Sequence, residues 1–224
     1  MKLTDAMSSR FSARAFLDTP VSQQTVHQIL DLARQCPSGT NIQPWKVNVV
    51  TGEVRKKLIE SSLAYMKENP TGPGPEHAIY PSEYLEPYQS RRMECVMGLF
   101  GIFEIDPSNA EQAQSVTVRN LNFYNAPVGL VFSMHKSLMP GQLGDLGIFM
   151  GNVMLAARQF GLHTCAQGTW QAVVPAIHEA LGISDEYLVY NGMALGHIDA
   201  EDPLNNLNAG RVEVDDFAEF MGFE

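Results

Sequence analysis

The chain has 224 residues, a length that suits one well-packed domain better than two. Its 25 acidic residues outnumber its 15 basic residues and give a net charge of −10, which argues against a general affinity for nucleic acid. With 45% hydrophobic and 18% charged residues, the composition is that of a soluble globular protein, and no apolar run approaches the roughly 20 residues that span a membrane.

The three cysteines indicate a reducing compartment. Cys36, Cys95 and Cys165 are odd in number and far apart, so we expect neither a disulfide framework nor a metal site. The first residues lack the apolar segment of a signal peptide. The sequence therefore predicts a cytoplasmic protein.

Helical and extended segments follow one another along the chain. Residues 22–35 have apolar side chains at helical spacing, with Ser22 as a suitable N-cap and Pro37 as a stop. Residues 126–134 are almost continuously apolar, as in a strand covered on both faces. The other predicted strands are 45–51 and 187–195, and the other helices predicted for the core are 53–66, 142–160 and 174–181. This mixture predicts an α+β fold with four or five strands in one sheet.

A long insertion precedes the 126–134 strand. Residues 68–81 contain four prolines and two glycines, which exclude regular structure there. Residues 83–103 and 106–122 have helical spacing. We expect one domain over residues 1–224, with residues 68–120 forming a largely helical excursion from its core.

The sequence RFSARAF, residues 10–16, is the first candidate for a binding site. Arg10, Ser12 and Arg14 alternate, so an extended backbone would place these three side chains on one side. Two guanidinium groups and a hydroxyl suit a phosphate, because arginine forms paired charge-assisted hydrogen bonds with it. A solvated basic edge explains the same pattern, and composition alone favours that alternative.

The sequence CPSGTNIQPWKV, residues 36–47, concentrates turn formers and side-chain amides. Asn41 and Gln43 each offer a donor and an acceptor, which suits the edge of a heterocycle, and Gly39 permits close approach of the backbone. The same residue types are common in turns that satisfy the backbone at a helix end. The residues alone leave both interpretations open.

The sequence TCAQGTW, residues 164–170, follows the long predicted helix where the chain is expected to re-enter the sheet. Gly168 would leave backbone N–H groups open toward a ligand. Cys165 has no assignable His or Asp partner, so we interpret it as a small buried apolar residue and not as a nucleophile.

Arg211 lies in a polar, Asn-rich tail and is the only Lys or Arg after Arg158. Two interpretations are open. Arg211 either pairs with Glu213 or Asp215, or it returns to the body of the protein and joins Arg10 at an anion.

In this order, the four segments resemble the FMN-dependent nitroreductase family. The similarity covers nearly the whole chain: R-x-S-x-R-x-F at 10–16, P-S-x-x-N-x-Q-P-W at 37–45, the APVGLVF strand, TCAQGTW and the late arginine. The segment YPSEYLEPYQSRR, residues 80–92, is similar to the nitrobenzoate-reductase-like branch. The resemblance implies a nitroreductase-like fold, with a central mixed or antiparallel sheet flanked by helices. It also implies an intertwined homodimer with two FMN sites at the interface.

The resemblance assigns a role to each basic candidate. Arg10 and Arg211 would hold the FMN phosphate, and Ser12 would hydrogen-bond the phosphate or ribityl region. Arg14 would lie at the pyrimidine edge of the flavin, where a positive charge stabilises the anionic reduced form. The chain departs from the family at Ala209, because many members carry a lysine two residues before the late arginine.

The resemblance also assigns the remaining candidates. Pro37, Ser38 and Asn41 would reach the FMN of the other subunit. Backbone N–H groups of Gln167 and Gly168 would face the N5 region of the flavin. The 68–120 excursion would cover the active site and shape its substrate pocket.

The activity implied is reduction of a small aromatic substrate, such as a nitroaromatic or a quinone, with NAD(P)H as co-substrate in a ping-pong cycle. No catalytic side chain is required, because the flavin carries the chemistry. Two alternatives stay open: other flavin chemistry on the same fold (dehalogenation, desaturation or flavin cleavage), and a non-catalytic flavin-binding protein. Four tyrosines either line the substrate pocket or close a small core of the excursion: Tyr65, Tyr80, Tyr84 and Tyr88.

Overall fold

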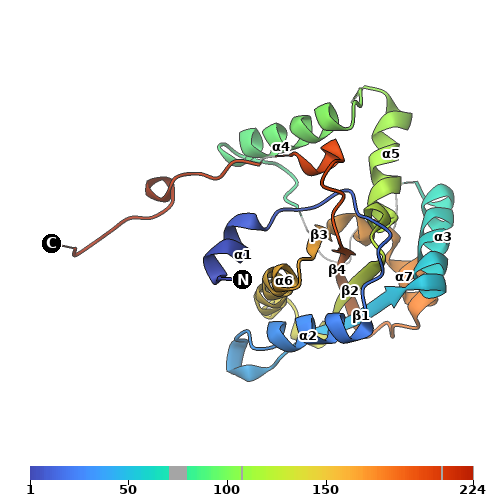
Figure 1. Ribbon diagram of the computed structural model, residues 1–224, viewed down its shortest axis with the longest axis horizontal. Coiled ribbons are helices and arrows are strands. Elements are labelled where there is room, and N and C mark those ends of the chain that lie inside the picture. The colour runs from blue at the N-terminus through green and yellow to red at the C-terminus, as the bar shows by residue number, and fades with distance from the viewer. Residues whose placement is uncertain (71–79, 107, 208, 224) are drawn as a thin grey trace.

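The computed structural model describes residues 1–70, 80–106, 108–207 and 209–223, and a four-stranded sheet lies at its centre (Figure 1). In sheet order, the strands are β1 (Lys46–Thr51), β2 (Val128–His135), β4 (Tyr187–Gly196) and β3 (His163–Gln167). All three neighbouring pairs are antiparallel. The predicted α+β class is confirmed, and the sheet, expected to be mixed or antiparallel, is antiparallel.

Helices cover both faces of the sheet, as the apolar sequence of β2 predicts. One face carries α2 (Gln23–Ala33) and α6 (Leu143–Gln159), and the other carries α3 (Gly52–Glu68), α5 (Ala110–Leu121) and α7 (Val174–Leu181). Along β2, Leu130 and Phe132 belong to the core under α2 and α6, whereas Val131 belongs to the core under α3 and α7. Successive side chains of a strand point to opposite faces, so β2 needs apolar residues at nearly every position.

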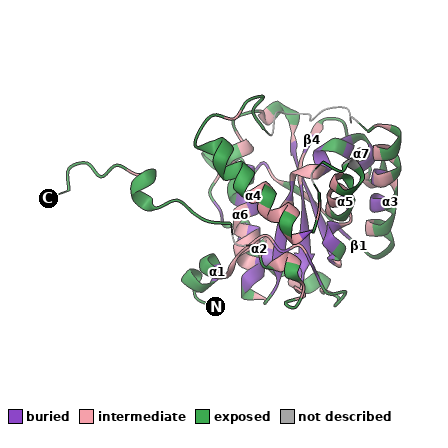
Figure 2. Cartoon of the chain, turned by 90° about the horizontal axis from the view of Figure 1, so that it is seen from above, coloured by how far each residue is buried: buried purple, intermediate pink, exposed green. Residues whose placement is uncertain are grey.

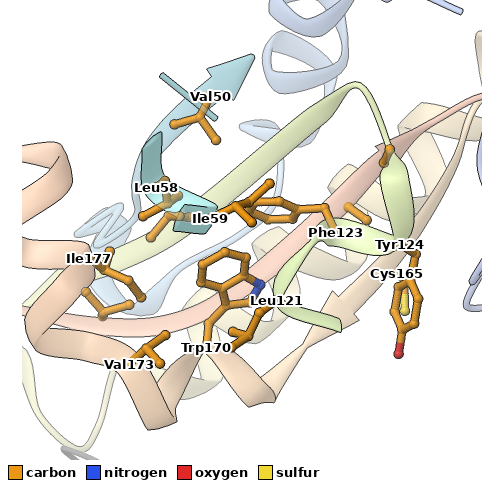
Figure 3. Close-up of a cluster of buried hydrophobic side chains, with 14 of the residues drawn as sticks. Val50, Leu58, Ile59, Leu121, Phe123, Tyr124, Cys165, Trp170, Val173 and Ile177 are labelled. Carbon is orange, nitrogen blue, oxygen red and sulfur yellow. The ribbon is translucent and has the colours of Figure 1, made fainter. Parts of the chain in front are cut away.

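Two glycines of the sheet make room for a pair of stacked aromatic rings (Figure 3). Phe123 and Trp170 are both fully buried, and their ring centroids lie 4.4 Å apart. A methyl group on Gly129 would collide with the ring of Phe123, and one on Gly192 would collide with the indole of Trp170. The missing side chains therefore let the two rings lie directly against the strands.

The N-terminal segment runs along the open edge of β3. It begins with a short helix, α1 (Leu3–Ser9), which the sequence analysis did not predict. Beyond this helix, Ser12 forms a parallel bridge with Thr164, and Phe16 forms an antiparallel bridge with Ile198. Residues 10–16 are therefore extended, which is the condition under which Arg10, Ser12 and Arg14 share one side.

Residues 68–120, expected as an excursion from the core, contain the helix α4 (Tyr88–Ile102) and most of α5. Helix α4 lies on the outside of the molecule, whereas α5 packs on the core through Leu121 (Figures 1 and 2). The helix predicted over 83–103 begins later, at Tyr88, because Pro87 takes the N-cap position. The helix predicted over 106–122 begins at Ala110, after the N-cap Asn109. Residues 71–79, most of the segment predicted to lack regular structure, lie outside the described residues.

After β4 the chain passes through a short 3-10 helix, Pro203–Asn205, and then leaves the body of the molecule as an extended tail (Figure 1). The other 3-10 segments are Gly39–Asn41, Phe123–Asn125, Lys136–Leu138, Gly168–Val173 and Val214–Asp216. Within the described residues, no helix is both long enough and apolar enough to cross a bilayer.

Candidate functional site

A cavity of about 450 Å³ brings together the basic candidates from the two ends of the chain. Arg10, Ser12 and Arg14 line it from the N-terminal segment, and Arg211 lines it from the tail. Three arginines and a serine thus line one volume in a chain of net charge −10. The volume lies in the range of known ligand sites, and the groups that line it suit a phosphorylated ligand.

The extended conformation of residues 10–16 explains why these side chains gather. The Ala13 N–H donates to the carbonyl of Thr164 on β3 at 3.1 Å, so the segment follows the strand and its alternate side chains turn the same way. Arg14 is held further by its own side chain, whose Nη1 donates to the carbonyl of Ser12 at 3.0 Å. Arg14 therefore keeps a fixed place beside the cavity.

Asn205 joins the N-terminal segment to the tail. Its Oδ1 accepts from the Arg14 N–H at 2.7 Å, and its Nδ2 donates to the carbonyl of Ala15 at 2.9 Å. These bonds bring the tail, and with it Arg211, to the cavity. The sequence did not single out Asn205 for this role, because its partners lie about 190 residues away along the chain.

Arg211 lines the cavity together with Arg10. Its Nη1 donates to the carbonyls of Ala209 and Gly210, both at 2.8 Å. In the described part of the chain it forms no ion pair with Glu213 or Asp215.

A buried polar network lies at the end of β3. Gln167 is 1% exposed, and its Nε2 donates to the carbonyl of Asn120 at 2.6 Å. The Gln167 backbone N–H donates to Oδ1 of Asn191 at 3.0 Å. Of the two backbone N–H groups that the resemblance assigns to the N5 region of the flavin, those of Gln167 and Gly168, the first is therefore already hydrogen-bonded within the chain. Neither Asn120 nor Asn191 was singled out from the sequence.

Tyr124 connects this network to Arg14. Asn120 Nδ2 lies 3.0 Å from the Tyr124 hydroxyl. Burial and the neighbouring Cys165 raise the pKa of Tyr124, and the opposing effects of Arg14 and Asn120 are smaller. Tyr124 is therefore a neutral hydrogen-bonding group beside the cavity residue Arg14.

The buried position of Cys165 agrees with its interpretation as an apolar residue. Its side chain is 3% exposed, and burial raises the pKa of its thiol to about 11, against a smaller lowering by Arg14. A thiol that stays protonated at neutral pH is a poor nucleophile.

The loop of Pro37, Ser38 and Asn41 lies apart from the cavity of the same chain, which none of these three residues lines. Its structure is tightly determined: Ser38 Oγ accepts from the Gln43 N–H at 3.0 Å, and Asp145 on α6 accepts from the Gly39 N–H at 3.0 Å. Ser38 thus satisfies the backbone, as the structural interpretation of this loop expects.

The same loop also holds strained backbone. Thr40, Asn41 and Gln43 have positive φ values of 48°, 60° and 54°, which L-residues adopt at a cost of roughly 1–3 kcal/mol each. Local strain of this kind is characteristic of functional segments. Asn41 is exposed on this strained turn.

The fold and the cavity define an α+β protein with an arginine-lined cavity, and comparison with known proteins gives its family. A model of the "Nitroreductase family" matches residues 7–197. The chain therefore belongs to the nitroreductase family, and the resemblance carried by its motifs is confirmed.

Relatives of this chain match over nearly their full length. It is 34% identical to the chloronitrobenzene nitroreductase of Comamonas testosteroni, over 98% of this chain and 96% of the relative. It is also 34% identical to the 4-nitrobenzoate reductase of Pseudomonas putida, over 97% and 95%. The crystal structure of an FMN and NADPH-dependent nitroreductase, NfnB from Sphigopyxis sp. strain HMH, superposes with a TM-score of 0.95 at 31% identity and covers 100% of both chains.

Proposed function

We propose that this protein is an FMN-dependent oxidoreductase that uses NAD(P)H to reduce small nitroaromatic compounds or quinones. The observation that carries the proposal is the cavity in which Arg10, Ser12, Arg14 and Arg211 converge from the two ends of the chain. Support also comes from the similar proteins, which are named as nitroreductases of chloronitrobenzene, nitrobenzene and 4-nitrobenzoate.

The residues of the cavity fit FMN. Arg10 and Arg211 would bind the phosphate, Ser12 would hydrogen-bond the phosphate or ribityl chain, and Arg14 would lie at the pyrimidine edge of the flavin. Bound FMN would supply the redox chemistry, as the carrier of a hydride equivalent from NAD(P)H to the oxidant. The chain's own task is to bind and orient the cofactor, and Gly168 offers its backbone N–H near the N5 edge.

The proposal includes a homodimer in which the loop of Pro37, Ser38 and Asn41 completes the site of the partner. The strained, exposed conformation of Asn41 supports this, because backbone strain is common in ligand-binding segments. The loop does not line the cavity of its own chain, so the ligand it would contact is that of the partner. The tail supports an intertwined assembly. Its large apolar side chains are exposed in the single chain: Val214, Phe217, Phe220, Met221 and Phe223.

We further place α4 over the active site as part of the excursion, and the protein in the cytoplasm. Cys36, Cys95 and Cys165 are free thiols, which suits a reducing compartment. Tyr88 on α4 is 63% exposed in the single chain, so it does not close a core within the excursion. Its ring is therefore available to a planar substrate.

Anaerobic turnover tests the activity. The purified protein is mixed with FMN, NADPH or NADH, and nitrobenzene or 4-nitrobenzoate, and the products are separated by chromatography. We expect the nitro group to be reduced, with matching oxidation of the nicotinamide. Flavin reduction without any nitro product would favour one of the other flavin reactions, and a flavin that NAD(P)H does not reduce would favour a binding protein.

A further inference from the structure

Helix α4 forms part of the wall of the arginine-lined cavity. Its Cys95 lines the cavity together with Arg10 and Arg211. One turn further on, a Cβ on Gly98 would lie 3.0 Å from Cδ1 of Leu207, so the helix packs closely on the segment that leads to Arg211. The relative position of α4 and the cavity is thus set by direct contact.

Helical geometry places Arg91 on the same face of α4 as these two residues. Arg91, Cys95 and Gly98 are spaced i, i+4 and i+7, which aligns them along one side of a helix. The Cα of Arg91 lies about 6 Å along the axis from that of Cys95, within the reach of an arginine side chain. The next residue, Arg92, is turned about 100° further around the helix.

The guanidinium of Arg91 is not committed elsewhere in the described residues. It is exposed and lies 5.9 Å from the ring centroid of Tyr88, a weak surface contact. No carboxylate among the described residues pairs with it. Arg91 can therefore turn toward an anion in the cavity at little cost.

Arg10 and Arg211 are the two cations of the cavity that the proposed function assigns to the phosphate. Ala209 lines it with a methyl group, and Nη1 of Arg211 is already bonded to the carbonyls of residues 209 and 210. A phosphate monoester carries a charge of about −1.5 to −2 at neutral pH and has three acceptor oxygens. Two arginines therefore leave hydrogen-bond acceptor positions of the phosphate without a cationic partner.

We propose that Arg91 is a phosphate-binding residue of the FMN site and supplies, from α4, a cation where Ala209 supplies none. The inference rests on the proposed FMN binding and adds a residue that acts on the phosphate alone. Riboflavin, which lacks the phosphate, should therefore be insensitive to Arg91.

Flavin titrations of the apo-protein test this assignment. Dissociation constants of FMN and of riboflavin are measured by quenching of flavin fluorescence for the full-length wild type, Arg91→Gln and Arg92→Gln. The Arg92→Gln variant is the matched control, because it removes the same charge from the same helix on a different side. Thermal melting of each apo-variant checks that the fold is kept.

We expect Arg91→Gln to weaken FMN binding about tenfold, with riboflavin affinity unchanged and Arg92→Gln like the wild type for both ligands. Wild-type affinity for FMN in Arg91→Gln would overturn the assignment. An equal loss of both flavins would overturn it too, since Arg91 would then act on the wall of the site and not on the phosphate. An equal loss of FMN affinity in Arg92→Gln would also contradict the assignment, because the loss would then come from the overall charge of α4 and not from a contact of Arg91 with the phosphate. A wild type that binds no FMN would instead overturn the proposed function itself.

Discussion

The side chains of Arg10, Ser12 and Arg14 turn the same way because their backbone follows β3. The bridge between Ser12 and Thr164 fixes the extended conformation, and Asn205 fixes the tail beside it. The proposed binding of an anion would therefore be a local property, set against an overall charge of −10.

Removing the two proposed phosphate ligands should release the cofactor. Each of Arg10→Ala and Arg211→Ala deletes a charge-assisted contact worth roughly 1.5–3 kcal/mol, so we expect the double variant to be purified without FMN. The flavin content of the protein after gel filtration measures this. Lys56→Ala removes one charge on the exposed surface of α3 and should keep its FMN. A double variant that stayed yellow would refute the assignment.

His163 should make the stability depend on pH. Burial, then Arg158, then His197, lower the pKa of His163 to about 4, and Arg158 Nη1 lies 2.9 Å from its Nδ1. The unfolded chain, with a histidine pKa near 6.5, binds the proton first. The contribution of neutral His163 to the free energy of unfolding is therefore complete above about pH 6.5. It is lost as the pH falls toward 4, and the loss reaches up to about 3 kcal/mol.

Denaturant unfolding of wild type and His163→Gln between these pH values measures the effect. Glutamine keeps an acceptor for Arg158 but does not titrate. The variant should thus show a smaller fall in the free energy of unfolding than the wild type. Parallel curves for the two proteins would show that His163 does not carry the pH dependence.

At the scale of elements, the periodicity of apolar residues predicted the main helices and strands. Contacts between segments that are distant in the sequence could not be predicted in this way. The apolar run 126–134 identified β2, and the spacing of 22–35 identified α2, because burial demands those periods directly. Helix α1 has only Ala6 buried, so its sequence carries little helical pattern. The bonds of Asn205 to residues 14 and 15 join positions about 190 apart, and no local pattern encodes them.

The sheet packs so closely against the stacked rings of Phe123 and Trp170 that a methyl group added at Gly192 should destabilise the protein. In Gly192→Ala the new Cβ would overlap the indole of Trp170, which is fully buried and cannot move aside. We expect a loss of roughly 1–3 kcal/mol in the free energy of unfolding, measured with urea. Gly101→Ala on α4 is the control, because a Cβ there meets nothing within 4 Å. Equal stability of the two variants would contradict the packing.

For the whole molecule, the single chain leaves an apolar tail without a partner. Phe217 is 70% exposed and Phe223 is 81% exposed, whereas aromatic residues of this size are usually well covered. The chain leaves the body of the molecule before these residues (Figures 1 and 2). We propose that a second copy of the chain covers this tail, because the proposed role of the Asn41 loop also requires a second subunit.

Ending the chain at Val212 should weaken the dimer and leave the arginines of the cavity in place. We expect full-length protein to sediment as a dimer, and the truncated protein to dissociate at a protein concentration at least about tenfold higher, since it loses several buried apolar side chains. Analytical ultracentrifugation over a concentration series gives both constants. A monomeric full-length protein, or a truncated dimer of unchanged affinity, would contradict the role of the tail.

The visible spectrum of the purified protein tests the central claim most directly. If Arg10, Ser12, Arg14 and Arg211 form an FMN site, protein supplied with FMN and then gel-filtered should keep the flavin absorption band. Anaerobic addition of NADPH or NADH should bleach the band, and a nitroaromatic should restore it. A colourless protein that cannot be loaded with FMN would contradict the account.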